Sequence, residues 1–120
     1  MTTKQTIERY FSALKDNGDW RSLLADDVAF TSHTSPVKHV DGRDAFLDST
    51  KRFYSTIASV DLRTLVVDGD RAVAATHYEL QPPKGPSFGS DVAEMFVVRD
   101  DKIVALDIFF DTAPFPKAPA

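Results

Sequence analysis

Apolar residues in the first part of the chain recur with the period of an amphipathic helix. They occupy positions 7, 10, 11 and 14, a spacing that predicts one helix with a single buried stripe. Thr2 and Gln5 have the spacing of a capping box, and Asn17-Gly18 predicts the end of the helix because both residues tolerate the left-handed conformation. We expect Asp19 to cap a second short helix and a third helix to begin near Asp44. These two helices carry Trp20, Leu23 and Leu24, and Phe46, Leu47, Thr50, Phe53, Tyr54 and Ile57, respectively.

After Ser59 the pattern changes from helical to extended. A short strand is expected earlier, near Val28 and Phe30, and Asp68-Gly69 predicts a tight hairpin turn. Residues 32–43 and the tail after Asp111 are expected to be irregular. Helices followed by a strand meander predict an α+β domain, with the helices on one face of an antiparallel sheet. The four meander strands are expected at residues 60–67, 71–81, 90–99 and 102–110.

Composition and charge indicate one domain over residues 1–120 and exclude several functions. The net charge is −4, and no basic run exceeds Lys51-Arg52, so we expect neither a nucleic-acid partner nor an anionic membrane surface. Cysteine is absent, which excludes disulfide and thiolate chemistry. Apolar runs are too short for a membrane span, and no secretory leader is seen, so a cytoplasmic location is expected.

The strands are apolar on both faces, as at Val97-Val98 and Phe109-Phe110, which favours a homodimer through the outer sheet face.

Several short motifs occur in an order that is typical of a known superfamily. The chain resembles nuclear-transport-factor-two-like proteins, and within them SnoaL-like proteins, ketosteroid isomerases and limonene-epoxide hydrolases. The resemblance implies a cystatin-like cone, in which a strongly curved antiparallel sheet wraps around three N-terminal helices and leaves an apolar cavity. The motifs that carry it are Arg9-Tyr10, Gly18-Asp19-Trp20, residues 24–30, residues 42–45, residues 99–103 and residues 109–115.

The resemblance also implies roles for single positions in that cavity. Tyr10 falls where the isomerases hold an oxyanion with a tyrosine, although a purely structural core position is the alternative. Ser32 stands where the isomerases have a carboxylate base, and serine cannot replace that base unaided; His33 lies beside it. Ile108 stands where epoxide hydrolases and SnoaL-type cyclases have a catalytic aspartate. These departures speak against all three known activities.

The last hairpin decides which carboxylates reach the cavity. Pairing across a two-residue turn at Asp100-Asp101 puts residues 93 and 95 on the same face as 106 and 108, because side chains alternate along a strand. The resemblance places Leu106 and Ile108 inside the cavity, so it implies that Ala93 and Met95 face inward. Glu94 and Asp107 would then face outward. A one-residue shift would instead put Glu94 at the position of the second isomerase acid.

His77 and Glu79 form the main candidate for acid–base chemistry. They lie two residues apart on one strand and therefore share a face, which the epoxide-hydrolase pattern places inside the cavity. A histidine beside a glutamate is a suitable dyad near neutral pH, and a structural ion pair is the alternative. His33, His39, His77 and Glu79 match no known metal-ligand spacing, so no metal is expected. Gly85-Pro86-Ser87-Phe88-Gly89 resembles a nucleophile elbow but lacks the strand–helix context.

The expected function is binding of a small, mostly apolar molecule in the cone. Acid–base chemistry of the isomerase, hydratase or dehydratase type would use His77, Glu79 and Tyr10, without a cofactor. The alternative is a non-catalytic homodimeric domain for ligand binding or assembly, whose cavity is filled by its own side chains. The residues expected to contact a ligand are Trp20, His33, Phe53, Tyr54, Phe88, Met95, Ile108 and Phe110, each of which also suits a plain core.

Overall fold

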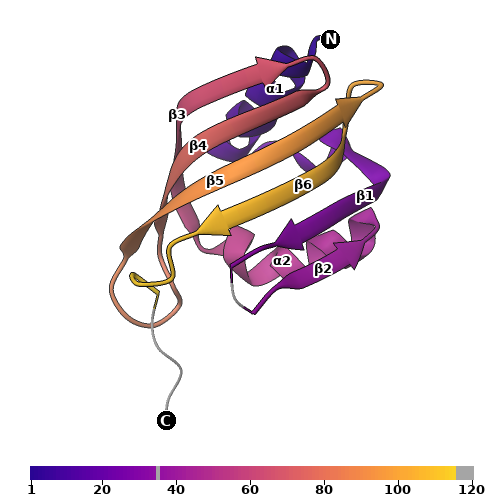
Figure 1. Cartoon of the computed structure of the whole chain (residues 1–120). Helices are drawn as coiled ribbons and strands as arrows, with labels where there is room; N and C mark the ends of the chain where they lie inside the picture. Colours follow the sequence, from indigo (N-terminus) through magenta and orange to yellow (C-terminus); the bar gives the residue numbers. More distant parts are fainter. Residues whose placement is uncertain (35, 116–120) are drawn as a thin grey trace.

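The computed structural model describes residues 1–34 and 36–115, which form an α+β fold (Figure 1). A single six-stranded sheet has the strand order β2-β1-β6-β5-β4-β3. β1 and β6 are parallel, and every other neighbouring pair is antiparallel. The elements are α1 (Thr3–Lys15), a 3₁₀ turn (Arg21–Leu23), β1 (Leu24–Ser32), β2 (Lys38–Asp41), α2 (Arg43–Ser55), β3 (Ile57–Asp68), β4 (Arg71–Leu80), β5 (Phe88–Arg99) and β6 (Lys102–Phe110).

Both helices lie on the same face of the curved sheet (Figure 1). α1 contacts β3, β4 and β5, whereas α2 contacts β1 and β2. The side chains between the two layers form one core, which includes the fully buried Ile7, Tyr10, Phe46 and Phe96. The opposite face of the sheet has no helix on it within the described residues, so it is the outer face of the cone.

The first helix forms as its sequence predicts. Thr2 Oγ1 accepts a hydrogen bond from the Gln5 backbone at 3.1 Å, and Gln5 Oε1 accepts one from the Thr2 backbone at 2.9 Å. Asn17 follows the helix with a φ of 55°. The expectation of three helices is not confirmed, because the second is a single 3₁₀ turn. Asp19 does accept from the Ser22 backbone at 3.2 Å, but β1 begins immediately after this turn and leaves no room for a longer helix.

The four-strand meander is confirmed as β3 to β6, with boundaries within a few residues of the prediction. β1 is longer than expected, and residues 38–41, predicted to be irregular, form the edge strand β2. That strand has no clear alternation to reveal it, since only Val40 is partly buried. The predicted irregular tail holds for residues 111–115, and its remainder lies outside the described residues. Within the described chain no helix combines the length and the apolar character needed to cross a membrane.

A β-bulge near the last turn sets which side chains face the core. Asp100 and Asp101 form the two-residue turn with φ values of 52° and 63°. Val98 pairs with Ile103, but the preceding Val97 pairs with Ala105. β6 therefore holds one extra residue, Val104, at this point. The pairing beyond it moves by one residue, and Glu94 lies opposite Ile108. The expectation that Ala93 and Met95 face inward and Glu94 outward is therefore wrong.

Candidate functional site

A cavity of about 250 Å³ lies between α2 and the inner face of the sheet. Its size is close to the lower end of typical ligand sites. Apolar side chains make most of its wall, and Lys38, Ser32, Tyr54, Tyr78 and Glu94 contribute polar groups. Ser32, Phe53, Tyr54, Ile108 and Phe110 were expected in the cavity from the sequence, and they line it. The other apolar wall residues include Phe30, Val92, Leu106 and Phe115.

Glu94 is the only carboxylate in this wall within the described residues, and its side chain is held in place. Glu94 is 3% exposed. Its Oε2 accepts hydrogen bonds from the Tyr78 hydroxyl and from the Thr76 hydroxyl, both at 2.7 Å. Its Oε1 has no hydrogen-bond partner among the described residues. In that part of the chain, Ser90 Oγ is the one side-chain polar atom that is both fully buried and without a partner. Glu94 Oε1 is therefore not fully sealed from solvent. Oε2 is thus held by two donors, and Oε1 has no partner among the described residues.

Burial raises the pKa of Glu94 to about 7, against the opposite effect of the two hydroxyl donors. An apolar surrounding disfavours the charged carboxylate, whereas donors to Oε2 favour it. Desolvation is the larger effect, so near neutral pH the carboxyl is populated both with and without its proton. A group in this state can give or take a proton at little cost.

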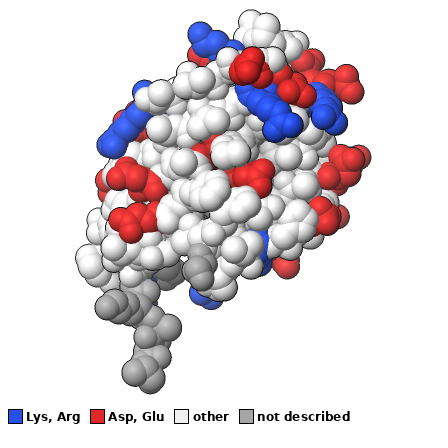
Figure 2. Space-filling model, in the orientation of Figure 1, with Lys and Arg blue, Asp and Glu red and all other residues white. Residues whose placement is uncertain are grey.

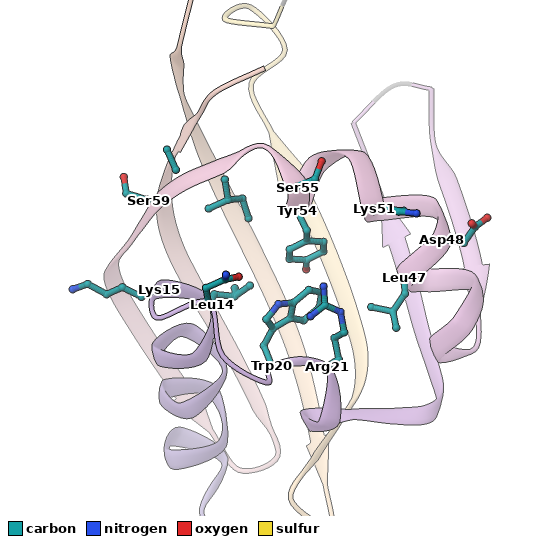
Figure 3. Close-up of a pocket in the computed structure, with 13 residues that line it drawn as sticks. Leu14, Lys15, Trp20, Arg21, Leu47, Asp48, Lys51, Tyr54, Ser55 and Ser59 are labelled. Atoms are coloured by element: carbon teal, nitrogen blue, oxygen red, sulfur yellow. The ribbon is translucent and has the colours of Figure 1, made fainter. Parts of the chain in front are cut away.

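Tyr54 lines both the cavity and a larger groove of about 750 Å³. Figure 3 shows the residues that line this groove. The groove lies between the end of α1, α2 and the start of β3. In it the Trp20 ring stacks on the Tyr54 ring with centroids 4.2 Å apart, and the Arg21 guanidinium lies 4.6 Å from the centre of the Trp20 ring. Trp20, expected to contact a cavity ligand, therefore belongs to this groove rather than to the cavity lining.

Tyr10 lies behind Tyr54 and is fully buried. The two hydroxyl oxygens are 2.7 Å apart and share a hydrogen bond. Burial raises the pKa of both phenols well above the ordinary value, so both stay protonated at neutral pH. Tyr10 is not part of the cavity lining, and any influence of its hydroxyl on a ligand would pass through Tyr54.

His77 and Glu79 do bond to each other, but on the outer face of the sheet. His77 Nε2 lies 2.7 Å from Glu79 Oε1, and His77 Nδ1 lies 2.7 Å from Asp91 Oδ1. These two hydrogen bonds, the one to Glu79 first, raise the pKa of His77. The expected cavity location of His77 and Glu79 is wrong, because the neighbouring Thr76 and Tyr78 are the residues of β4 that point inward.

Three other predicted ligand contacts also lie outside the cavity. His33 is on the outer side, where its Nε2 lies 2.8 Å from Asp107 Oδ1 and its ring stacks on Phe109. Met95 is exposed on the outer face because of the bulge. Phe88 lines an adjoining hollow rather than the cavity itself.

The sequence contained one signal for the inward side of β4. Ala72, Ala74, Thr76, Tyr78 and Leu80 are its small or apolar phase, whereas the other phase holds His77 and Glu79. This alternation alone predicts that the histidine and glutamate face solvent. No similar signal exists for Glu94, because both phases of β5 are mostly apolar.

Comparison with known proteins agrees with this architecture. The family model of the SnoaL-like domain matches residues 7–106. An NTF2-like protein from Burkholderia thailandensis E264 superposes with a TM-score of 0.78 at 20% identity, over 93% of this chain and 92% of that chain. A Jannaschia sp. CCS1 protein described as a SnoaL-like polyketide cyclase gives 0.77 at 18% identity, over 96% and 93%. A Rhodopseudomonas palustris protein described as an isomerase gives 0.73 at 14% identity, over 92% and 90%.

No curated protein matches the sequence. At identities below 25% the superpositions establish the fold alone, and the family assignment rests on the match of the family model to most of the chain. The superpositions and the family model agree with the resemblance that the sequence motifs indicate. The chain therefore belongs to the SnoaL-like domain family, and its fold is that of the NTF2-like protein from Burkholderia thailandensis.

Proposed function

We propose that this SnoaL-like domain binds a small, mostly apolar molecule in its cavity and that Glu94 exchanges a proton with it. The observation that carries the proposal is the state of Glu94: a buried carboxyl with one oxygen fixed, the other unpartnered, and a pKa of about 7. Proton transfer at a carbon next to a carbonyl, or at a hydroxyl, fits such a group. The reaction class would be an isomerisation, a hydration or a dehydration.

The surrounding groups support this role for Glu94. Tyr78 and Thr76 hold Oε2, so the free Oε1 is the atom that would donate to or accept from the ligand. Tyr54 also lines the cavity, and its hydroxyl shares a hydrogen bond with the Tyr10 hydroxyl, which can act as the donor. In that arrangement the Tyr54 proton is free to bond a carbonyl oxygen on which negative charge develops. Proteins of this fold that are described as an isomerase and a polyketide cyclase are in keeping with such chemistry.

Proton exchange on a simple ketone tests the proposal without the physiological substrate. The probe is 2-tetralone, a bicyclic apolar ketone, and the readout is NMR measurement of deuterium uptake next to its carbonyl in D₂O. We expect the protein to accelerate this exchange, with an increase in rate as pH rises through about 7 and Glu94 loses its proton. Glu94→Gln abolishes the acceleration, because an amide cannot take the proton.

Glu79→Gln is the discriminating variant, since it removes the carboxylate that the sequence favoured. We expect Glu79→Gln to exchange 2-tetralone at the wild-type rate. Loss of exchange in Glu79→Gln with full activity in Glu94→Gln would reverse the assignment. Binding of 2-tetralone, seen as NMR shifts of cavity residues, without faster exchange would leave a domain that only binds ligand.

We also propose that the chain forms a homodimer through the outer face of the sheet, which the non-catalytic alternative shares. Figure 2 shows this face as a broad uncharged area interrupted by a few acidic groups. Val66, Val73, Met95 and Phe109 are large apolar residues that are 42% to 60% exposed. Val66 pairs with Val73, and Val73 pairs with Met95, so three of them form a continuous row. Contiguous apolar surface of this kind favours an interface between protein chains.

A further inference from the structure

A second hollow, of about 720 Å³, adjoins the cavity at the end of α2. Its walls come from the last turns of α2, the end of β4 and the loop that follows it. Ser49, Phe53 and Phe115 line both this hollow and the cavity that contains Glu94. The hollow therefore lies next to the cavity, with Phe53 and Phe115 between the two. We call it the vestibule.

The vestibule and the mouth of the cavity carry positive charge. Arg52 and Lys84 line the vestibule, and Lys38 lines the cavity. All three are exposed, and within residues 1–34 and 36–115 none forms an ion pair. The only carboxylate among the described lining residues is Glu94. This local excess of cations contrasts with the net charge of −4 for the whole chain.

We infer that the ligand of this site is an apolar carboxylate whose charged group lies in the vestibule, between Arg52 and Lys84. The inference rests on the proposed function, because it takes the inner cavity as the place of the reacting group. The inner volume of 250 Å³ equals roughly eight water molecules at about 30 Å³ each, so the inner part holds a small skeleton. A longer ligand must extend past Phe53 and Phe115 into the vestibule, where the unpaired cations compensate its charge.

The position of Arg52 favours a carboxylate over a phosphate. Arg52 lies in the last turn of α2, whose backbone carbonyls give this end of the helix a partial negative charge. Phosphate sites commonly use the backbone N–H groups of a helix N-terminus, and the vestibule is lined by the opposite end of α2. The groups of the vestibule that can bind an anion are therefore side-chain cations, and one arginine with one lysine suffices for a singly charged carboxylate.

The groove beside Trp20 is the competing site for an anion. Lys15, Arg21 and Lys51 line it, together with the carboxylate of Asp48 (Figure 3). Lys51 is adjacent to Arg52 in the sequence but lines the groove rather than the vestibule. Lys51→Gln is therefore a matched control for Arg52→Gln. The single tryptophan of the chain gives one indole N–H signal, which reports directly on binding in the groove.

The test is an NMR titration of ¹⁵N-labelled protein with octanoate, 1-octanol and octyltrimethylammonium at pH 6, where Glu94 is mostly protonated. These probes have apolar chains of nearly equal length, seven carbons beyond the carboxylate in octanoate and eight in the other two, and they differ in the charge of the head group. We expect shifts at Phe53 and Phe115, and octanoate to bind about fivefold more tightly than 1-octanol, because an exposed ion pair contributes at most about 1 kcal/mol. Octyltrimethylammonium should bind most weakly.

The variants decide where the charge is recognised. The double variant Arg52→Gln/Lys84→Gln should bring octanoate to within about twofold of 1-octanol, whereas Lys51→Gln should leave the difference intact. Equal affinity for octanoate and 1-octanol in the wild type overturns the inference. So does loss of the preference in Lys51→Gln together with an octanoate-dependent shift of the Trp20 indole, which would place the anion in the groove.

The ketone exchange assay separates this inference from the proposed function. If 2-tetralone exchange requires Glu94 but octanoate has no advantage over 1-octanol, the carboxylate class is wrong and the acid–base function stands. If octanoate is preferred through Arg52 and Lys84 but no exchange occurs, the site recognises an anionic ligand without catalysis. If none of the three probes shifts Phe53 or Phe115, the inference is wrong irrespective of the exchange result.

Discussion

Glu94 is under two opposing influences, and their balance determines what it can do. Its surroundings are apolar, which disfavours the carboxylate, while Tyr78 and Thr76 donate to Oε2 and favour it. Without these donors a carboxyl so deeply buried would stay protonated well above neutral pH. With them its pKa is about 7. The hydroxyl pair therefore adjusts the acidity of Glu94 as well as its orientation.

The elevated pKa of Glu94 makes stability depend on pH in a particular direction. In the unfolded chain the carboxyl loses its proton near its ordinary pKa of about 4.5. Between that value and about 7 the folded state binds more protons than the unfolded state, so stability falls as pH rises. The loss amounts to about 3 kcal/mol at most and is complete above pH 7. We expect Glu94→Gln to lack this component.

Urea denaturation of the wild type and Glu94→Gln at pH 5 and pH 8.5 measures the effect. The difference between the two proteins isolates Glu94 from other titrating groups, because those groups are common to both. At each pH we compare the free energy of unfolding of Glu94→Gln with that of the wild type. This difference should favour the variant more at pH 8.5 than at pH 5. An equal stability difference at both pH values would mean that Glu94 titrates in the folded protein much as it does in water.

Removal of one hydroxyl donor should raise the pKa of Glu94 further. Tyr78→Phe keeps the ring in its packing against Phe53 but deletes the 2.7 Å hydrogen bond to Oε2. One strong bond to a carboxylate is equivalent to about one pKa unit. The measurement is ¹³C NMR of the Glu94 carboxyl across pH. Tyr54→Phe is the control, since its hydroxyl bonds to Tyr10 rather than to Glu94; an equal rise there would show that packing alone sets the pKa.

At the scale of elements, the sequence predicts what local spacing determines. The helical stripe, the capping box and the hairpin turn predicted at Asp68-Gly69 each act within a few residues, and each is present in the structure, the turn one residue further on at Gly69-Asp70. The bulge in β6 is different, because it depends on how Val97 and Val98 pair with a neighbouring strand. Both phases of β5 are apolar enough to face inward, so the pattern cannot reveal the shift. That one residue decides whether Glu94 belongs to the site.

β2 and the true location of His77 show two further limits. A four-residue edge strand exists because β1 offers a partner, and its own sequence has no alternation. The alternation of β4 predicts the outer face for His77, whereas the resemblance to epoxide hydrolases implies the cavity. Local pattern was the better guide there because the inner phase of a strand must suit the core it contacts.

The bonds of His77 depend on the absence of a side chain at Gly89. Gly89 pairs with Glu79 across the two strands, and a Cβ at Gly89 would lie 2.7 Å from His77 Cε1 and 2.9 Å from Nε2. Gly89→Ala must therefore displace the imidazole. Since Glu79 and Asp91 raise the pKa of His77, we expect this variant to lower it toward its ordinary value of about 6.5.

Proton NMR of the three imidazoles across pH tests this prediction. His33 and His39 lie in other hydrogen bonds, to Asp107 and to Thr31 and Asp41, and serve as internal controls. Their ring-proton signals should be the same in Gly89→Ala as in the wild type. An unchanged pKa for His77 would mean that Glu79 and Asp91 follow the ring to its new position.

At the scale of the whole molecule, the two faces of the sheet differ in what covers them. The inner face supports the cavity and the core, and the helices cover it. The outer face keeps large apolar side chains in contact with water, which is unfavourable for a chain that acts alone. A second copy of the chain would remove this surface from water, and a two-fold axis would place the same row of residues on both sides of the interface.

A charge in the middle of this row should break such a dimer. Met95 is 42% exposed and lies between Val73 and Asp107 in the register of the sheet. Met95→Lys adds two ammonium groups to a two-fold interface, and it should weaken the dimer at least about tenfold, because removing these charges from water costs more than pairing with the neighbouring Asp107 returns. Val37→Lys is the matched control: Val37 is 66% exposed but precedes β2, away from this row.

Sedimentation velocity at micromolar concentration should show a wild-type dimer, a Val37→Lys dimer and a Met95→Lys monomer. A monomeric wild type would disprove the dimer, and equal dissociation of both variants would place the interface elsewhere.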